Sequence, residues 1–170
     1  MTTEIPNLLI FGYGNPSRGD DALGPLLLER LERALGPDIR LAAGGIEFLT
    51  DFQLQVEDAL DLADRKLALF IDAHSKCAPP YRFERIRPAE ERAYTTHALS
   101  PAAVLSVYQK INGAPPPPCF LLGIRGEAFE LGAGLSDPAE AHLEAALRLA
   151  LELCAHPCVE YWQSRAVAGD

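Results

Sequence analysis

Residues 8–25 read LLIFGYGNPSRGDDALGP. The stretch begins with an apolar run, continues into a loop with glycines, and leads into a helical pattern over residues 26–35. The order strand, glycine loop, helix is typical of the first unit of an α/β domain with a parallel sheet. Two adjacent carboxylates, Asp20 and Asp21, lie where the predicted helix begins. This loop is therefore the first candidate for a functional site.

The composition is that of an ordinary globular domain. The chain has 170 residues, of which 48% are hydrophobic and 23% are charged, so we expect one domain over residues 1–170 with a sizeable core. The formal net charge of −9 argues against nucleic acid or an anionic membrane surface as a partner.

The sequence also predicts a cytoplasmic protein. No apolar run approaches the length of a membrane span, and the first residues lack the basic start of a signal peptide. The cysteines are scattered through the chain, so we expect free thiols rather than a disulfide framework. They are Cys77, Cys119, Cys154 and Cys158.

Strands and helices are predicted to alternate along the chain. Besides residues 8–11, buried strands are predicted at residues 67–72 and 119–124, a short strand at 39–43, and a half-exposed or edge strand at 81–86. Helices are predicted at residues 26–35, 46–62 and 101–110, and a last long helix is expected after Ser136. The tail after Cys158 has no clear pattern. This alternation predicts a three-layer α/β/α domain with a largely parallel sheet of about five strands.

Two missing features argue against a nucleotide site in the glycine loop. A dinucleotide fingerprint has a third glycine where this chain has Ser17, and an acidic residue near the end of the second strand, where residues 41–44 read LAAG. The carboxylates at the end of the loop would also repel a pyrophosphate.

Three side chains from separate segments are predicted to form a split site. One aspartate suffices to cap a helix, so we assign that role to Asp20 and leave Asp21 as the free carboxylate. Asp72 ends a buried strand and His97 lies in a later loop. Each residue alone has an ordinary structural role, but two carboxylates and one imidazole together suit a divalent metal with positions left open for a substrate.

Other candidates are weaker. His74, two residues after Asp72, competes with His97 and is kept as a supporting residue. Asn15 is either a donor to a developing oxyanion or a brace of the loop, and we favour the brace. Cys154, His156 and Cys158 have the wrong spacing for a zinc finger and lack a second ligand pair.

The motifs resemble those of a known family, the hydrogenase maturation endopeptidases, which process the large subunit of nickel–iron hydrogenases. Gly12-Tyr13-Gly14-Asn15, followed by Asp20-Asp21 and Gly24, is similar to the signature of that family. The resemblance continues through Asp72, His97 and residues 122–124, and covers roughly residues 8–151. The loop itself is most similar to the branch serving soluble, NAD-reducing hydrogenases.

This resemblance implies a twisted five-stranded sheet between helices and three nickel-binding positions, which fall on Asp21, Asp72 and His97. It also implies a monomer that removes a C-terminal peptide from the large subunit once nickel is in place, so that the nickel is carried by the substrate. Two departures are visible: Ala22 stands where many members have glycine, and residues 41–45 lack an aspartate often found before paired glycines.

The mechanism is left open by the sequence. Nickel could position the scissile bond and polarise its carbonyl or acidify a water, or Asp21 or Asp72 could act as a general base on that water. Two other functions remain as alternatives: a non-catalytic nickel-dependent checkpoint or chaperone for the large subunit, and a small-molecule amidohydrolase on the same scaffold.

Overall fold

A computed structural model describes residues 4–91 and 99–168. The five strands are β1 Leu8–Tyr13, β2 Ile46–Asp51, β3 Leu67–His74, β4 Tyr81–Ile86 and β5 Cys119–Arg125. The helices are α1 Leu23–Ala34, α2 Pro37–Ala42, α3 Pro101–Asn112, α4 Asp137–Ala155 and α5 Val159–Arg165, with short 3₁₀ helices η1 at Gly19–Ala22 and η2 at Val56–Leu62.

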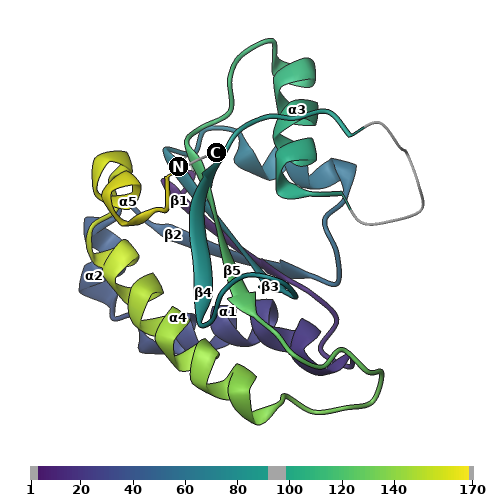
Figure 1. Ribbon diagram of the computed structural model, residues 1–170. Helices are drawn as coiled ribbons and strands as arrows, with labels where there is room; N and C mark the ends of the chain where they lie inside the picture. Colours follow the sequence, from purple (N-terminus) through teal and green to yellow (C-terminus); the bar gives the residue numbers. More distant parts are fainter. Residues whose placement is uncertain (1–3, 92–98, 169–170) are drawn as a thin grey trace.

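The strands form one twisted sheet in the order β2-β1-β3-β5-β4 (Figure 1). β1 pairs in parallel with β2 and β3, and β3 pairs in parallel with β5. β4 is antiparallel to β5 at the edge of the sheet, which confirms the predicted edge strand. The α/β prediction, with a largely parallel sheet of five strands, is also confirmed.

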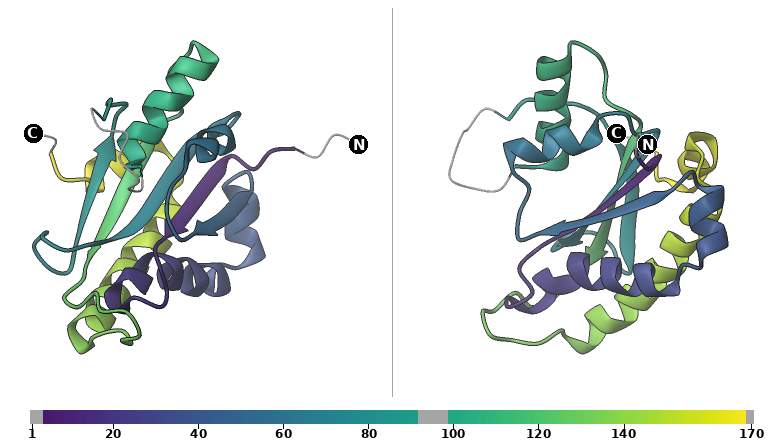
Figure 2. Two further views of the ribbon diagram at one scale, coloured as in Figure 1. Left: turned by 90° about the vertical axis from the view of Figure 1, so that its right-hand side faces the viewer. Right: turned by 180° about the vertical axis from the view of Figure 1, so that it is seen from behind.

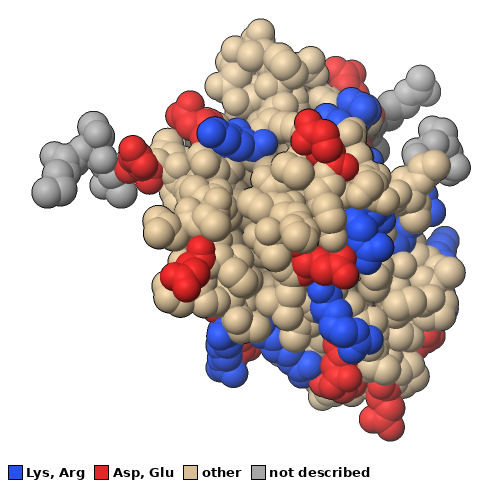
Figure 3. Space-filling model, turned by 90° about the vertical axis from the view of Figure 1, so that its left-hand side faces the viewer, with Lys and Arg blue, Asp and Glu red and all other residues tan. Residues whose placement is uncertain are grey.

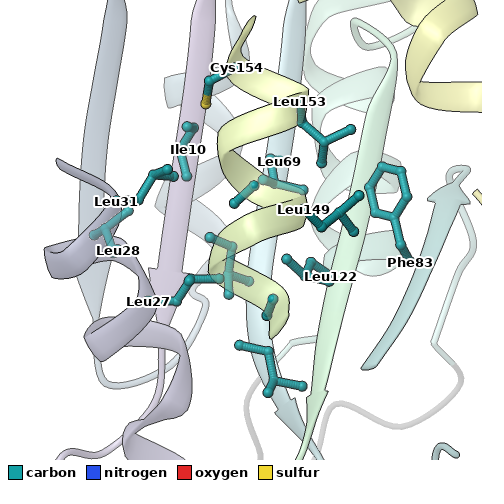
Figure 4. Close-up of a cluster of buried hydrophobic side chains, with 14 of the residues drawn as sticks. Ile10, Leu27, Leu28, Leu31, Leu69, Phe83, Leu122, Leu149, Leu153 and Cys154 are labelled. Atoms are coloured by element: carbon teal, nitrogen blue, oxygen red, sulfur yellow. The ribbon is translucent and has the colours of Figure 1, made fainter. Parts of the chain in front are cut away.

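Helices cover both faces of the sheet (Figures 1 and 2). On one face α1, α4 and α5 pack in a cluster with Ile10, Leu69 and Leu122 (Figure 4). On the other face, side chains of α3 and η2 pack against Leu9, Phe11 and other residues of the sheet. Successive residues of β1 therefore enter opposite clusters, and this is why its sequence is continuously apolar.

The predicted strand at residues 39–43 is wrong, because this segment forms the helix α2, Pro37–Ala42. Pro37 lies at the start of the helix, where its missing N–H costs little and its fixed φ suits the first turn. None of the α2 residues is buried, so the helix left no apolar periodicity in the sequence.

The predicted helix at residues 46–62 is wrong at its start, and only its last part is helical, as the 3₁₀ helix η2. Its first part is the strand β2, which pairs with β1 from Leu8 opposite Ile46 to Tyr13 opposite Asp51. Ile46 and Phe48 pack on one face of the sheet and Leu49 on the other. Because apolar residues of this strand lie on both faces of the sheet, their spacing in the sequence is similar to that of a helix. Only pairing with β1 shows that the segment is a strand.

The tail forms the short helix α5, which the sequence pattern did not indicate. Trp162 is fully buried, lies 5.3 Å from the ring centre of Phe120, and donates its indole N–H to the carbonyl of Leu153 at 2.9 Å. Beyond α5, the amide of Val167 donates to the carbonyl of Phe83 at the outer edge of β4. Val167 therefore covers the edge of the sheet at β4.

The surface over α4 and α5 carries both signs of charge side by side (Figure 3). The ion pair of Arg165 with Glu152, 3.0 Å apart, belongs to this pattern. In the part of the chain that the structure describes, no helix is long and apolar enough to cross a membrane.

Candidate active site

The carboxylates predicted from sequence meet at one point of the sheet. β1 and β3 are neighbours, but the chain continues from β1 to β2 on one side and from β3 to β4 and then β5 on the other. Such a switch point leaves a crevice outside the carboxyl ends of the two strands, where sites of α/β sheets form. The η1 segment after β1 brings Asp21 to this crevice, and Asp72 lies near the end of β3.

Glycines allow α1 to begin very close to the sheet. A Cβ on Gly24 would lie 2.4 Å from the carbonyl oxygen of Tyr13 and 2.7 Å from that of Ile71. A Cβ on Gly12 would lie 2.7 Å from the carbonyl oxygen of Gly24. Any side chain at either position would push the helix, and with it η1, away from the ends of β1 and β3.

The loop between β1 and η1 is held by Asp21 and Asn15. The backbone N–H of Asn15 donates to Oδ2 of Asp21 at 2.7 Å, and the side-chain oxygen of Asn15 accepts from the N–H of Ser17 at 2.9 Å. Asn15 thus makes the contact of a loop brace. Gly14 has a φ of 145°, and a Cβ there would lie 2.1 Å from the carbonyl oxygen of Asp21.

Asp72 is the most strongly perturbed carboxylate described at this edge. Burial raises its pKa from 3.8 to about 7, and the nearby charge of Asp21 acts in the same direction. Hydrogen bonds from the N–H of Ala73, at 2.8 Å, and from the phenol of Tyr13 oppose this rise. Near pH 7 the two aspartates therefore share a site in which one carboxyl is only half ionised.

Tyr13 is a site residue to which the sequence assigned no role. It is the last residue of β1, beside Asp72, because Gly12 is the register partner of Ile71. The residue is 6% exposed and its hydroxyl is hydrogen-bonded to Asp72. Burial and the charges of Asp72 and Asp21 raise the pKa of Tyr13 well above 10.0, so the phenol stays a donor. Only the strand register could have revealed this pair.

Asp20 does not cap the helix as predicted. Its side chain is fully buried and accepts four hydrogen bonds from across the molecule, at 2.7 to 3.0 Å: from the N–H groups of Glu127, Ala128 and Ser136 and from the hydroxyl of Ser136. Burial raises its pKa, but these donors outweigh burial and lower it below 3.8. Asp20 thus joins η1 to the loop before α4, and Asp21 is left to the crevice.

The two histidine candidates have different outcomes. His97 lies outside the described residues, so its place at the site stays a prediction. Nδ1 of His74 accepts from the N–H groups of Lys76 and Cys77, at 3.0 and 2.9 Å. His74 therefore braces the turn that follows β3.

The cysteines are free, as expected, and three of the four are buried. Cys154 lies in the core, where burial raises the pKa of its thiol to about 12, while Cys158 is exposed. Within residues 4–91 and 99–168, no group of three or more His, Cys, Asp and Glu side chains could hold a metal ion. A metal at the crevice would accordingly need a ligand from outside these residues.

Comparison with known proteins identifies the family. The chain is 31% identical over 154 residues to the hydrogenase expression/formation protein HoxM of Azotobacter vinelandii, covering 88% of this chain and 73% of that protein. It is 32% identical over 151 residues to the hydrogenase 2 maturation protease of Escherichia coli, covering 85% of this chain and 88% of the relative. The chain belongs to the nickel–iron hydrogenase maturation endopeptidase family. It is therefore a hydrolase of the peptidase class.

Solved structures of this family share the fold. The hydrogenase maturating endopeptidase HybD of E. coli superposes with a TM-score of 0.68 at 28% identity, over 89% of this chain and 93% of that one. The hydrogenase maturation protease HycI of Thermococcus kodakarensis, at 24% identity, has the same fold with a TM-score of 0.61, over 88% and 92% of the two chains. No protein-family model matches the chain.

Proposed function

We propose that this peptidase removes the C-terminal extension of a nickel–iron hydrogenase large-subunit precursor, and that Asp21, Asp72 and His97 recognise the nickel that the precursor carries. The observation that carries the proposal is the pairing of Asp21 and Asp72 at the β1/β3 crevice. The names of the relatives, a hydrogenase expression/formation protein and a hydrogenase 2 maturation protease, support the choice of substrate.

The electrostatics of the pair favour a cation. The raised pKa of Asp72 reflects burial and the charge of Asp21, and both penalties fall when a divalent ion is bound between the carboxylates. Carboxylates and an imidazole are acceptable ligands for nickel. Two or three such ligands without a thiolate would hold a substrate-bound nickel weakly enough for the processed subunit to leave with it.

The chain near His97 supports its inclusion. Leu99, two residues later, donates its N–H to the carbonyl of Leu54 at 3.4 Å. Leu54 follows the carboxyl end of β2. Leu99, two residues after His97 in the sequence, therefore lies near the edge of the sheet at which β2 ends. We propose that His97 supplies the third ligand from this segment.

Asp72 also suits a second role. A carboxyl with a pKa of about 7 is a competent general base near neutral pH, because it is partly ionised and still basic enough to accept a proton from water. The hydroxyl of Tyr13 and the N–H of Ala73 hold this carboxylate in one orientation. This role is an alternative to coordination by Asp72: Asp72 takes the proton of the attacking water, and Asp21 and His97 face the metal.

The test is cleavage of purified precursor, with and without nickel, by the wild-type protein and by Asp21→Asn, Asp72→Asn and His97→Ala. We expect nickel-dependent shortening of the precursor and a loss of at least about 100-fold in rate for each variant. Asp64→Asn and His156→Ala, at exposed positions away from the crevice, are the matched controls and should cleave normally.

Other outcomes would overturn the proposal. Nickel-dependent binding without cleavage would indicate a checkpoint or chaperone, and turnover of a generic amide with the precursor uncut would indicate an amidohydrolase. If all three variants cleave like the wild-type protein, the site is wrong. The assignment to the branch serving soluble NAD-reducing hydrogenases stays a prediction, which a panel of precursors would test.

A further inference from the structure

A cavity of about 350 Å³ lies at the turn that joins β3 to the edge strand β4. This volume is within the range of about 300–1,000 Å³ that is usual for ligand sites. The function proposed above uses none of the residues that line the cavity. They are His74, Cys77, Ala78, Tyr81, Arg82 and Val167.

The turn at this cavity is held in one shape by hydrogen bonds. Nδ1 of His74 accepts from the N–H groups of Lys76 and Cys77. Nη1 of Arg125 donates to the carbonyl of Cys77 at 2.6 Å, and the backbone N–H of Arg125 donates to the carbonyl of Pro80 at 3.0 Å. The wall of the cavity is therefore formed before a ligand enters, which lowers the entropic cost of binding.

His74 offers a hydrogen-bond donor at this wall. Because Nδ1 accepts two hydrogen bonds, the neutral imidazole carries its proton on Nε2. The ring lies against the backbone of β5, since a Cβ on Gly123 would be 3.1 Å from Cδ2 of His74. Within residues 4–91 and 99–168, the hydrogen bonds of this ring are those to Nδ1. A ligand in the cavity can therefore accept from the Nε2–H.

The charge at the cavity is positive, although the chain has a formal net charge of −9. Burial raises the pKa of the Cys77 thiol, and the charges of two cations, Arg125 and Arg82, act in the opposite direction. Arg82 is also paired with Glu84. Arg125 is paired with Glu127 at 3.4 Å. The cavity therefore suits a single negative charge, because a second one would meet these carboxylates.

This chemistry selects the ligand. A cation would be repelled by the two guanidinium groups, and a dianion such as phosphate by the carboxylates that pair with them. A carboxylate accepts from an imidazole N–H and is attracted by a guanidinium. Ala78, Tyr81 and Val167 supply apolar surface in the cavity, which suits the carbon atoms of an organic acid. We propose that the cavity binds an organic monocarboxylate, whose carboxylate group lies between Nε2 of His74 and the guanidinium of Arg82.

The carboxylate has two sources, because a free small acid and the end of a peptide present the same group. His74 follows Asp72 by two residues on β3, which is about 7 Å along a strand. The cavity thus lies beside the candidate active site and is formed by different residues. The inference does not rest on cleavage of the precursor, because it concerns binding of an acid to the free protein.

The experiment is a titration of the isotope-labelled protein, followed by NMR at the backbone amides of Lys76, Cys77 and Arg125. The probes are isovalerate for a free acid and N-acetylvaline for the end of a peptide, with N-acetylvalinamide as the uncharged match and inorganic phosphate as the dianion. We expect saturable shifts with a Kd on the order of 1 mM for the acids, and binding at least about tenfold weaker for the amide and for phosphate. A Kd at least about threefold lower for N-acetylvaline than for isovalerate indicates a peptide as the source, and otherwise a free acid is indicated.

Two variants test the charge of the cavity. Arg82→Gln removes a cation and should raise the Kd of isovalerate at least about fivefold. Val167→Glu adds a carboxylate at a position that lines the cavity and is 43% exposed, and it should raise the Kd by a similar factor. The matched controls are Arg33→Gln, where the arginine is also paired with a carboxylate, and Val56→Glu, at a position 51% exposed on η2. Both controls should keep the wild-type Kd.

The inference is wrong if the acids give no saturable shifts, or if N-acetylvalinamide binds as tightly as N-acetylvaline. It is also wrong if phosphate binds more tightly than the acids, which would indicate a phosphate site. Controls that lose as much affinity as Arg82→Gln and Val167→Glu would overturn it as well. If Arg82→Gln lowers the melting temperature, Val167→Glu decides, because its position is exposed.

Discussion

Replacing Asp72 by asparagine should stabilise the folded protein at pH 8 relative to the wild-type protein, although it removes a residue of the site. The folded protein holds the pKa of Asp72 at about 7, against 3.8 for an ordinary aspartate. Each pKa unit corresponds to about 1.36 kcal/mol, so keeping Asp72 fully ionised in the fold costs about 4 kcal/mol. Asparagine has nearly the same shape and carries no charge, and it avoids this cost.

The pH dependence follows from the direction of the shift. The folded state binds the proton of Asp72 more tightly than the unfolded state, so this residue favours folding at low pH and loses that contribution as the pH rises through about 7. Between pH 5 and pH 8 the wild-type protein should lose about 2.5 kcal/mol from this group alone. The Asp72→Asn variant lacks this loss.

The assay is urea unfolding of both proteins at pH 5 and pH 8, with the difference in unfolding free energy compared between the two pH values. Other titrating groups are present in both proteins and largely cancel in this comparison. Asp64→Asn, at an exposed position, should show no such change. A difference between the wild-type protein and Asp72→Asn that stays constant within about 0.5 kcal/mol from pH 5 to pH 8 would refute the reasoning.

Two further predictions concern Asp20 and Tyr13. Asp20→Ala removes the buried acceptor of four hydrogen bonds and should lower the free energy of unfolding by at least about 3 kcal/mol in urea titration. The control Glu144→Ala, at a position exposed on α4, should change this free energy by less than about 0.5 kcal/mol. An equal effect of the two substitutions would contradict the assigned role of Asp20. Tyr13→Phe removes a donor that lowers the pKa of Asp72, so the acidic limb of the pH–rate profile of cleavage should move to higher pH. Tyr161→Phe, which loses a surface hydrogen bond to Glu152, should leave the profile in place; an unmoved profile for Tyr13→Phe would show that the phenol does not act on the titrating group.

The buried strands were predictable because their sequences carry the cause of their structure. β1, β3 and β5 are apolar on both sides and end in polar or glycine-containing loops, and a helix covers each face. The segment between residues 37 and 62 was not predictable in the same way. α2 buries none of its residues, and β2 at the sheet edge has no fully buried residue. Local pattern therefore could not decide between helix and strand there.

The residues of the site also differ in whether local sequence or distant partners determine their roles. The sequence predicted that Asp21 and Asp72 lie together, because each is a carboxylate at a place where a parallel sheet presents functional groups, and the charge of Asp21 does act on Asp72. The roles of Asp20 and Tyr13 were not found, because both depend on partners distant in sequence. The donors to Asp20 lie more than 100 residues away, and the partner of Tyr13 is set by the register of β1 against β3.

The sequence by itself determined the fold class, the glycine loop and the family, since these depend on apolar runs and on local residue types. The sequence also assigned the structural role to Asp20 and left Asp21 free, but only the tertiary structure decided that Asp20 holds the loop before α4 instead of capping the helix. Asp20 and Asp21 are adjacent, identical in chemistry and part of the same short helix. They differ because the turn of η1 points one carboxylate at the loop before α4, where buried N–H groups must be satisfied, and leaves the other beside Asp72.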